Sequence, residues 1–518
     1  MSSKSVEAIQ YSDNTVIEKS TPDTMSNEAT QNQGSARPTE SIPTEPIELV
    51  QEAYSIFTPT QKRMIVCLVS LAGVFSPLSA NIYFPALNAV QADLGVTAEM
   101  VNLTIFSYLI FQAVSPSMWG SLADVWGRRP IYICCFVIYI GACVGLALVP
   151  NYGGLLILRM VQAFGGSSVI AIGSGTIGDI ATRNERGGYM GLFGLGPTFG
   201  PILGPVIGGA LAQTLGWRSI FWLLAIASFV VLIPMVLFLP ETLRSLIGNG
   251  SGYANPTLSQ FYKKHHQPEK WALAHSTATT STGPKNRSRS YPNPLKSLLL
   301  LFEKDVALVV FYLALVYAVF YAMQSSVSLL FATIYGLNDL EIGLTFIASG
   351  VGCMVGTFAT GKIMDRDYRV ILRPLEANAP EVKDRGKLDP SFPIEAARMR
   401  STWICMIILY ICVILYGWML EMRVHLAVPL VLQAIMGYCT TAIFNAISTL
   451  LVDLFPGSSA SVSATNNLAR CTLGAVATVV VQPAIDGIGV GWAFTVFGII
   501  IVVATVLPFL EYKLGLRF

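Results

Sequence analysis

Residues 187–209 read GGYMGLFGLGPTFGPILGPVIGG and lie inside an apolar segment long enough to cross a bilayer. A four-residue repeat runs through them, carried by Gly196, Gly200, Gly204 and Gly208, with Pro197, Pro201 and Pro205 beside it. Small residues on one helical face let a neighbouring backbone approach closely, and each proline removes a backbone hydrogen bond and bends the helix. The pattern suits a static packing face and equally a helix between moving parts. We expect this span to line a seam between two moving halves.

The composition around this stretch is that of an integral membrane protein. Of the 518 residues, 53% are hydrophobic and 12% are charged, whereas soluble domains carry about 25% charged residues. All nine cysteines fall in apolar segments, so the sequence offers neither a disulfide framework nor a metal-binding motif. Residues 1–61 are rich in Ser, Thr, Glu, Gln and Pro, and we expect a disordered cytoplasmic tail there.

Apolar stretches of about 18 or more residues are long enough to span a bilayer, and they form two sets of six. We expect them near 64–87, 101–122, 130–150, 154–177, 189–213, 219–239, 306–332, 342–364, 402–420, 427–452, 460–484 and 491–510. The fold class is therefore an all-α membrane protein with 12 transmembrane helices in two six-helix halves. The expected divisions are a bundle at 62–240, a cytoplasmic central loop at 241–305, a second bundle at 306–512 with a cytoplasmic insertion at 365–400, and a C-terminus at 513–518.

Lysine and arginine are distributed unevenly between the two sides of these spans. Most of the 33 lie in the tail, the central loop, the insertion and the other segments of the same side, and the opposite loops hold only Arg218 and Arg423. By the positive-inside rule both termini are cytoplasmic.

A short motif occurs once in each half. Residues 120–129 follow the second span and residues 361–369 follow the eighth, and both keep a glycine, an aspartate four residues on and an arginine four beyond that. An internal repeat of six spans is the architecture of alternating-access transporters. We expect two charged gating loops, in which the aspartate accepts hydrogen bonds and the arginine holds a neighbouring helix end. Their residues are Gly120, Asp124, Gly127, Arg128, Arg129, Gly361, Asp365 and Arg369, of which Arg129 alone suits ordinary membrane anchoring.

Charge inside the spans is confined to two arginines. Every Asp and Glu falls in a tail, a loop or a span end, which leaves Arg159 and Arg470. A lone charged side chain at the bilayer centre costs at least about 2.5–3.5 kcal/mol, so each arginine should face a cavity or a partner. With the mid-span amides they make a candidate transport path: Arg159, Gln162, Gln324, Gln433, Asn445, Asn466, Asn467 and Arg470.

A cavity with two guanidinium groups and no carboxylate favours neutral or anionic cargo, because charge attraction is strong in a low dielectric. We expect carboxylates such as citrate or a related di- or tricarboxylate. The alternative is that both arginines are conformational elements bonded to backbone carbonyls. Protons could travel through Asp124 or Asp179, through water linked to Arg159, or on the substrate itself.

Several of these motifs resemble the major facilitator superfamily, and within it the fungal twelve-span drug:proton antiporters. Residues 120–129 resemble the superfamily's signature loop, except that Val125 stands where a basic residue is usual. Residues 159–166 are similar to the fourth-span motif, whose arginine is implicated in proton coupling. The antiporter motif is matched by Gly200, Pro201, Gly204, Pro205, Gly208 and Gly209. Residues 240–242 and 466–471 resemble the quinidine-resistance-like branch, which also contains polyamine and organic-acid exporters.

The resemblance implies the major facilitator fold and a proton-coupled exporter in the plasma membrane. We expect a monomer whose partners are the lipid bilayer, protons and a small-molecule substrate, either an organic acid anion or a drug. We expect no cofactor beyond the proton gradient, no metal, no nucleic acid and no enzymatic activity. The motifs for ATP binding, zinc proteases and serine hydrolases are missing from the sequence. A nutrient importer on the same fold and a non-transporting membrane sensor remain as alternatives.

Overall fold

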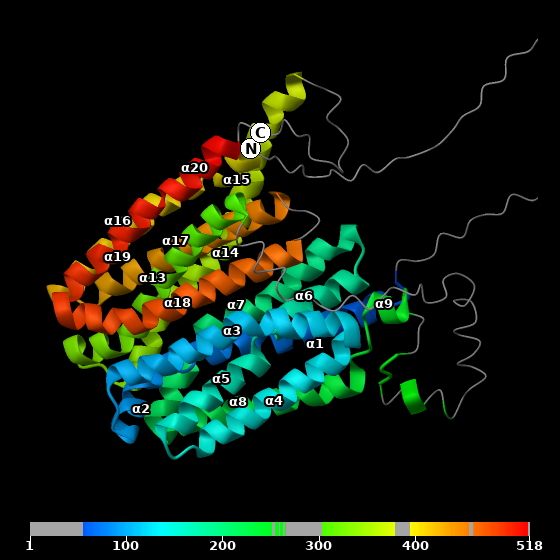
Figure 1. Cartoon of the computed structure of the whole chain (residues 1–518), viewed down its shortest axis with the longest axis horizontal. Coiled ribbons are helices and arrows are strands. Elements are labelled where there is room, and N and C mark those ends of the chain that lie inside the picture. Colours follow the sequence, from blue (N-terminus) through cyan, green and yellow to red (C-terminus); the bar gives the residue numbers. More distant parts are fainter. Residues whose placement is uncertain are drawn as a thin grey trace, which may run out of the picture. The chain divides into compact units, whose positions relative to one another are not determined.

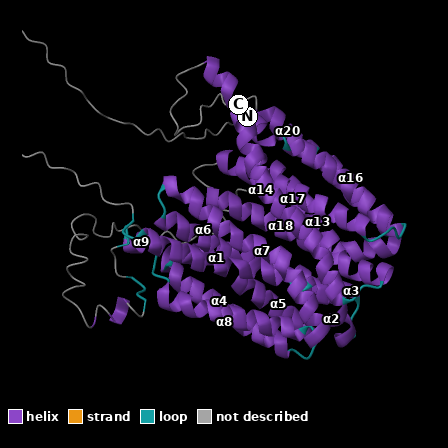
Figure 2. Ribbon diagram, turned by 180° about the vertical axis from the view of Figure 1, so that it is seen from behind, coloured by secondary structure: helices purple, strands orange, loops and turns teal. Residues whose placement is uncertain are grey.

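The structure is a computed structural model that describes residues 55–250, 254–257, 260–262, 265, 303–378, 394–454 and 459–515. Most of the expected tail and central loop therefore lie outside the described residues. Within them, 12 helical segments are long and apolar enough to cross a membrane, as predicted. Figures 1 and 2 show helices throughout and no strand in the described part of the chain.

The first half contains residues before the central loop. Its elements are α1 (Pro59–Asn81), the 3-10 helix η1 (Phe84–Ala86), α2 (Leu87–Leu94), α3 (Ala98–Trp126), α4 (Arg128–Leu148), α5 (Tyr152–Gly166), α6 (Val169–Ile180), α7 (Arg183–Leu215) and α8 (Arg218–Phe238). A short helix, α9 (Arg244–Ile247), follows it. The chain enters α1 through a capping box, in which Thr58 and Gln61 exchange side-chain-to-backbone hydrogen bonds.

The second half contains the remaining long helices. They are α13 (Lys304–Tyr335), α14 (Asp339–Asn378), α15 (Ile394–Met399), α16 (Thr402–Glu421), α17 (Ala427–Leu454), α18 (Ser459–Ile488), α19 (Val490–Ala504) and α20 (Val506–Gly515). Figure 1 shows the helices of each half grouped together, the first in blue to green and the second in yellow-green to red.

The fourth span is two helices, because the chain breaks between α5 and α6. Ser115 on α3 donates to the carbonyl of Phe164 at 2.6 Å, and the indole of Trp119 donates to the same oxygen at 3.0 Å. The hydroxyls of Ser115 and Ser168 lie 2.6 Å apart. Since a helix break inside a membrane exposes backbone polar groups that lipid cannot satisfy, α3 supplies the missing partners.

The halves meet along two seams that follow the internal repeat. The second span, α3, packs along α18, the eleventh, and the fifth span, α7, packs along α14, the eighth. Each seam thus joins the second helix of one half to the fifth helix of the other. For orientation, we call the end of the bundle that carries Asp124 the Asp124 end and the opposite end the Asp93 end.

The prediction that residues 361–369 form a loop is wrong. Residues 361–369 are helical, and α14 continues through them to Asn378. In the first half the chain turns at Gly127, whose φ of 110° is in the left-handed region that glycine tolerates. Seven residues after Gly361 the matching position is Tyr368, so the backbone has no such turning point and remains helical. The side chain of Asp365 lies outside the described residues.

Candidate functional site

The glycine stripe of α7 packs mainly inside its own half. A β-carbon at Gly200 would lie 2.7 Å from the backbone nitrogen of Leu78, and one at Gly204 would lie 3.1 Å from that of Ile82. Gly196 and Gly208 also face α1, whose carbonyls at Ser70 and Ile82 leave no room for a side chain. The four-residue repeat therefore brings α7 against α1 rather than against the other half.

A different part of the same motif reaches the seam. A β-carbon at Gly343 of α14 would lie 2.5 Å from the carbonyl oxygen of Pro205 and 3.3 Å from the Cα of Gly209. Gly350, two turns further along α14, faces Ile202. The prediction that the fifth span lines the seam thus holds for Pro205 and Gly209, whereas the every-fourth glycines form a close packing face within the first half.

Arg159 is enclosed in the first half, with 1% of its surface exposed. Its guanidinium carbon lies 4.4 Å from the ring centre of Tyr83 and 4.3 Å from that of Tyr108. Nη1 donates to Oε1 of Gln162 at 2.7 Å, while Gln162 is fixed by a contact between its Nε2 and the Cys143 sulfur at 3.2 Å. Two aromatic faces and an amide stabilise the charge here, although Nε of Arg159 is buried without a hydrogen-bond partner among the described residues.

Arg470 has a more open position on α18 and is partly exposed. Its guanidinium carbon lies 4.4 Å from the ring centre of Tyr317 on α13 and 5.2 Å from that of Phe444 on α17. Nη2 donates to Oδ1 of Asn467 at 2.9 Å. Its Nε is buried and has no hydrogen-bond partner among the described residues. A buried donor without a partner is costly, so an acceptor that reached it would be stabilised.

Asn467 connects this arginine to the other half. Its Nδ2 donates to the backbone carbonyl of Gln112 on α3 at 3.2 Å, across the α3–α18 seam. The side-chain Oε1 of Gln112 is also buried without a partner among the described residues. Gln112 is not among the residues of the predicted path, although it is a lone amide in the middle of the second span, as the predicted amides are in theirs.

The other amides of the candidate path have different surroundings. Asn466 donates from Nδ2 to the Ser448 hydroxyl at 3.2 Å, which ties α18 to α17 one turn from Asn445. Gln433 donates to the Tyr416 hydroxyl at 3.2 Å and so belongs to the packing of α17 on α16. Gln324 is 3% exposed, and its Oε1 has no partner in the described part of the chain. The structure thus brings Asn466, Asn467 and Arg470 together and places Arg159 and Gln162 apart from them.

The Gly120 motif forms a charged cluster at the Asp124 end. The guanidinium of Arg128 lies 2.8 Å from Asp124 Oδ1 and 3.1 Å from Asp179 Oδ2. Oε1 of Glu241 accepts the backbone N–H of Arg128 at 2.8 Å, which caps the N-terminus of α4 with a carboxylate. Arg129 donates to backbone carbonyls, including that of Val236 at 2.6 Å. All of these partners belong to the first half or to the segment that follows it.

Two more ion pairs at this end also remain within a half. Lys62 on α1 donates to Oε2 of Glu185 at 2.8 Å, and its ammonium holds the pKa of the Glu185 carboxyl below its ordinary value. Arg398 Nε lies 2.9 Å from Asp453 Oδ2 in the second half. These contacts fix the helix ends of each half without joining the halves.

At the Asp93 end the halves are joined directly. The ring of Phe84 stacks on that of Phe346, with 5.9 Å between their centres, and meets Tyr321 edge-on at 6.2 Å. The hydroxyl of Ser328 donates to the Phe84 carbonyl at 2.6 Å, and Nδ2 of Asn88 donates to the Ser328 carbonyl at 2.9 Å. We call these five residues the Phe84 closure. In this state the Asp93 end is closed by contacts between the halves.

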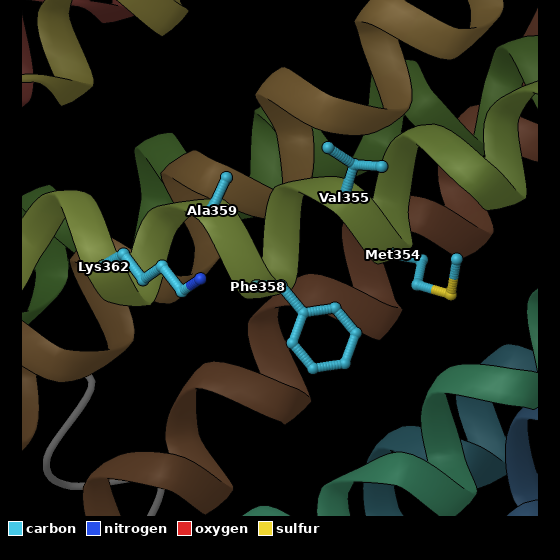
Figure 3. A pocket seen from close by; sticks show the side chains of 5 residues that line it. All are labelled: Met354, Val355, Phe358, Ala359 and Lys362. Carbon is cyan, nitrogen blue, oxygen red and sulfur yellow. The ribbon is translucent and has the colours of Figure 1, made fainter.

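A cavity of about 340 Å³ lies on the surface of α14, towards the Asp124 end. It is lined by Met354, Val355, Phe358, Ala359 and Lys362, which Figure 3 shows along one stretch of this helix. Phe358 points away from α14 on one side and Val355 on another, and Lys362 supplies the charged group (Figure 3). Met354 lies one turn past Gly350, which faces Ile202 of α7, so the groove borders the α7–α14 seam. None of its residues is a member of the candidate path.

Comparisons with known proteins agree with this architecture. Residues 69–479 match the family model of the Major Facilitator Superfamily. The chain is 40% identical over 476 residues to Citrate exporter 1 of Aspergillus niger, covering 89% of this chain and 87% of that protein. It is 31% identical over 479 residues to Quinidine resistance protein 1 of Saccharomyces cerevisiae, covering 89% of this chain and 84% of that protein.

Solved structures are similar in fold at low sequence identity. A bacterial homolog of the human lysosomal transporter Spinster, in an inward-facing and unoccupied conformation, matches with a TM-score of 0.59 and 14% identity over 89% of this chain and 99% of that one. The human organic anion transporter MFSD10 (TETRAN) matches with a TM-score of 0.54 and 16% identity over 87% of this chain and all of that one. With its twelve spans, its repeated seams and its family match, the chain belongs to the Major Facilitator Superfamily.

Proposed function

We propose that this protein exports organic acid anions with two or three carboxylates, with citrate as the reference substrate, by alternating access. The observation that carries the proposal is the environment of Arg470. It is a partly exposed guanidinium on α18, the helix that packs along α3 of the other half, and its Nε, like that of Arg159, has no partner in the described residues. Arginine binds carboxylates through two parallel hydrogen bonds, and burial strengthens that attraction. The 40% identity to a citrate exporter supports the same substrate class.

In this proposal the two arginines have different tasks. Arg470 binds a substrate carboxylate. Arg159 contacts Tyr83, Tyr108 and Gln162 and so stabilises the packing of the helices of the first half. The side-chain oxygens of Asn466 and Gln112 are buried without partners among the described residues, and they could accept a hydrogen bond from a hydroxyl or a protonated carboxyl of the substrate.

Direction and energy source follow from the charge distribution and the motif of the fifth span. The distribution of basic segments supports a cytoplasmic Asp124 end and cytoplasmic termini. In this proposal the protein lies in the plasma membrane. The state with the Phe84 closure formed would then take up cargo from the cytoplasm, and opening of that closure would release it outside. The proton gradient drives the cycle, and the substrate itself is able to carry the protons.

Export of apolar drugs is the second candidate. The aromatic rings of Tyr317, Tyr321 and Phe444 near Arg470 offer an apolar surface, and Quinidine resistance protein 1 is 31% identical to this chain. Cationic drugs are disfavoured, because the charge between the halves is positive and no carboxylate of the described spans lies beside it.

Deletion of the gene separates the two candidates. The measurement compares extracellular organic acids and growth on a panel of drugs between the deletion strain and its parent. Loss of one secreted di- or tricarboxylate with unchanged drug tolerance supports the proposal. Unchanged acid secretion with lost tolerance to a neutral drug supports the second candidate instead.

A further inference from the structure

We propose that Asn467 is the positioning residue that couples substrate binding at Arg470 to the contact between the two halves. The proposal rests on the proposed function, because it assumes that a carboxylate binds Arg470. Asn467 bonds the arginine through Oδ1, at 2.9 Å, and the opposite half through Nδ2, at 3.2 Å to the carbonyl of Gln112. The planar amide group of Asn467 therefore contacts both Arg470 and the opposite half.

The geometry of the guanidinium explains why a substrate disturbs this arrangement. Nε–H and Nη2–H point in the same direction and form the fork that a carboxylate accepts side-on. In this structure Nε has no partner among the described residues, while Nη2 donates to Asn467. Nη2 carries two N–H groups, one of them beside Nε–H, so in this proposal a carboxylate that takes Nε–H and that Nη2–H displaces Asn467 Oδ1 or confines it to the second Nη2–H.

When Asn467 Oδ1 is displaced from Nη2, the Asn467 amide can turn towards another donor. The Cys471 thiol, one helical turn along α18, lies 3.6 Å from Asn467 Oδ1, and the amide can turn towards it and shorten that contact. Because Oδ1 and Nδ2 belong to one rigid plane, rotation of the amide about its side chain also moves Nδ2 away from the Gln112 carbonyl. Substrate binding thereby weakens a contact across the α3–α18 seam, and the empty site restores it.

The coupling predicts different effects for two variants. Asn467→Ala removes both hydrogen bonds, so citrate still binds Arg470 but no longer affects the seam. Asn467→Asp keeps the acceptor, turns it into a charged competitor for the same guanidinium and removes the donor to Gln112. Its citrate affinity should fall by about tenfold or more, since the new ion pair must be broken first. Thr478→Val is the matched control, because the Thr478 hydroxyl bonds only within α18.

The test measures binding and conformation separately on the purified full-length protein. Binding is measured with [14C]citrate, with Arg470→Ala as the reference for specific binding. Conformation is measured by hydrogen–deuterium exchange of peptides covering residues 82–94 and 325–337, which contain Phe84, Asn88 and Ser328 of the Phe84 closure. In the wild type and in Thr478→Val, citrate should change exchange in these peptides. In Asn467→Ala, citrate should bind with an affinity within about threefold of wild type, and the exchange response should be lost.

The outcomes are distinguishable. Wild-type protein without Arg470-dependent citrate binding contradicts the proposed function, whatever Asn467 does. An Asn467→Ala variant that binds citrate and keeps the wild-type exchange response overturns the coupling, as does one that folds but loses citrate binding altogether, because Asn467 would then be a binding residue. If Asn467→Ala does not fold, Asn467→Asp decides: wild-type affinity together with a wild-type exchange response overturns the inference.

Discussion

Glu241 and Arg128 lie 113 positions apart in the chain and meet at the start of α4, where Oε1 of Glu241 accepts the backbone N–H of Arg128 at 2.8 Å. The same oxygen accepts the N–H groups of Thr242 and Leu243 at 2.9 and 3.0 Å, and Oε2 accepts from Asn255 at 2.9 Å. With 3% of its surface exposed, this carboxylate holds the turn at the end of the first seam helix, α3, against the segment that leaves α8.

The first prediction concerns this cap. Glu241→Gln keeps the size of the side chain but removes the charge that strengthens its hydrogen bonds, which should lower the stability of the protein by about 1.5–3 kcal/mol. Thermal unfolding of the purified protein measures the effect. Glu341→Gln is the control, because Glu341 accepts one backbone N–H, that of Asn338, at an exposed helix start, whereas Glu241 accepts three. Equal losses for the two variants would contradict the capping role.

A second prediction follows from the packing of α7 on α1. Gly200→Val should destabilise the first half by about 1–3 kcal/mol, because the added carbons overlap the backbone at Leu78. Gly194→Val is the control on the same helix, since nothing lies within 4 Å of a β-carbon there. Thermal unfolding and the yield of monodisperse protein measure both. Similar behaviour of the two variants would show that the stripe is not a close packing face.

The enclosure of Arg159 gives a third prediction. Arg159→Lys loses the planar group that stacks between Tyr83 and Tyr108, at a cost of about 2 kcal/mol or more for a desolvated cation. Stability should fall while the affinity for citrate stays within about twofold of wild type. Unfolding temperature and the KM of citrate transport are the two readouts. A raised KM at unchanged stability would place Arg159 in the substrate site instead.

A fourth prediction tests the Phe84 closure. Cysteines introduced together by Asn88→Cys and Ser328→Cys should form a disulfide in the state described here, because Asn88 Nδ2 lies 2.9 Å from the Ser328 carbonyl. The cross-linked protein should lose transport, and a reductant should restore it. Asn88→Cys alone is the control. Full transport by the cross-linked protein would mean that this end does not open during the cycle.

Much of the fold could be predicted from sequence because a bilayer imposes strong constraints. Apolar length gave the 12 spans, and the repeated Gly–Asp–Arg spacing indicated the two halves. The path of the chain beyond Gly361 could not be predicted from that spacing. The turn in the first half depends on Gly127, and Tyr368 at the matching position lets α14 continue to Asn378.

The sequence predicted several residues of the candidate site but not how their helices are arranged around it. Helical spacing placed Asn466, Asn467 and Arg470 on one face, and the structure brings them together. Sequence spacing cannot say which helix faces a given stripe, so the α7 glycines were expected at the seam and most of them pack on α1. Sequence spacing also could not distinguish Arg159 from Arg470, because their aromatic neighbours come from other segments. Arg159 lies against Tyr83 and Tyr108, and Arg470 lies against Tyr317.

The central claim is that Arg470 binds the substrate carboxylate. The measurement is [14C]citrate transport into or out of proteoliposomes containing wild type, Arg470→Lys or Arg470→Ala, each checked for folding by unfolding temperature. We expect Arg470→Ala to lose transport and Arg470→Lys to raise the KM by about tenfold or more, because an ammonium cannot form the two-pronged contact. Wild-type KM and rate in both folded variants would contradict the account.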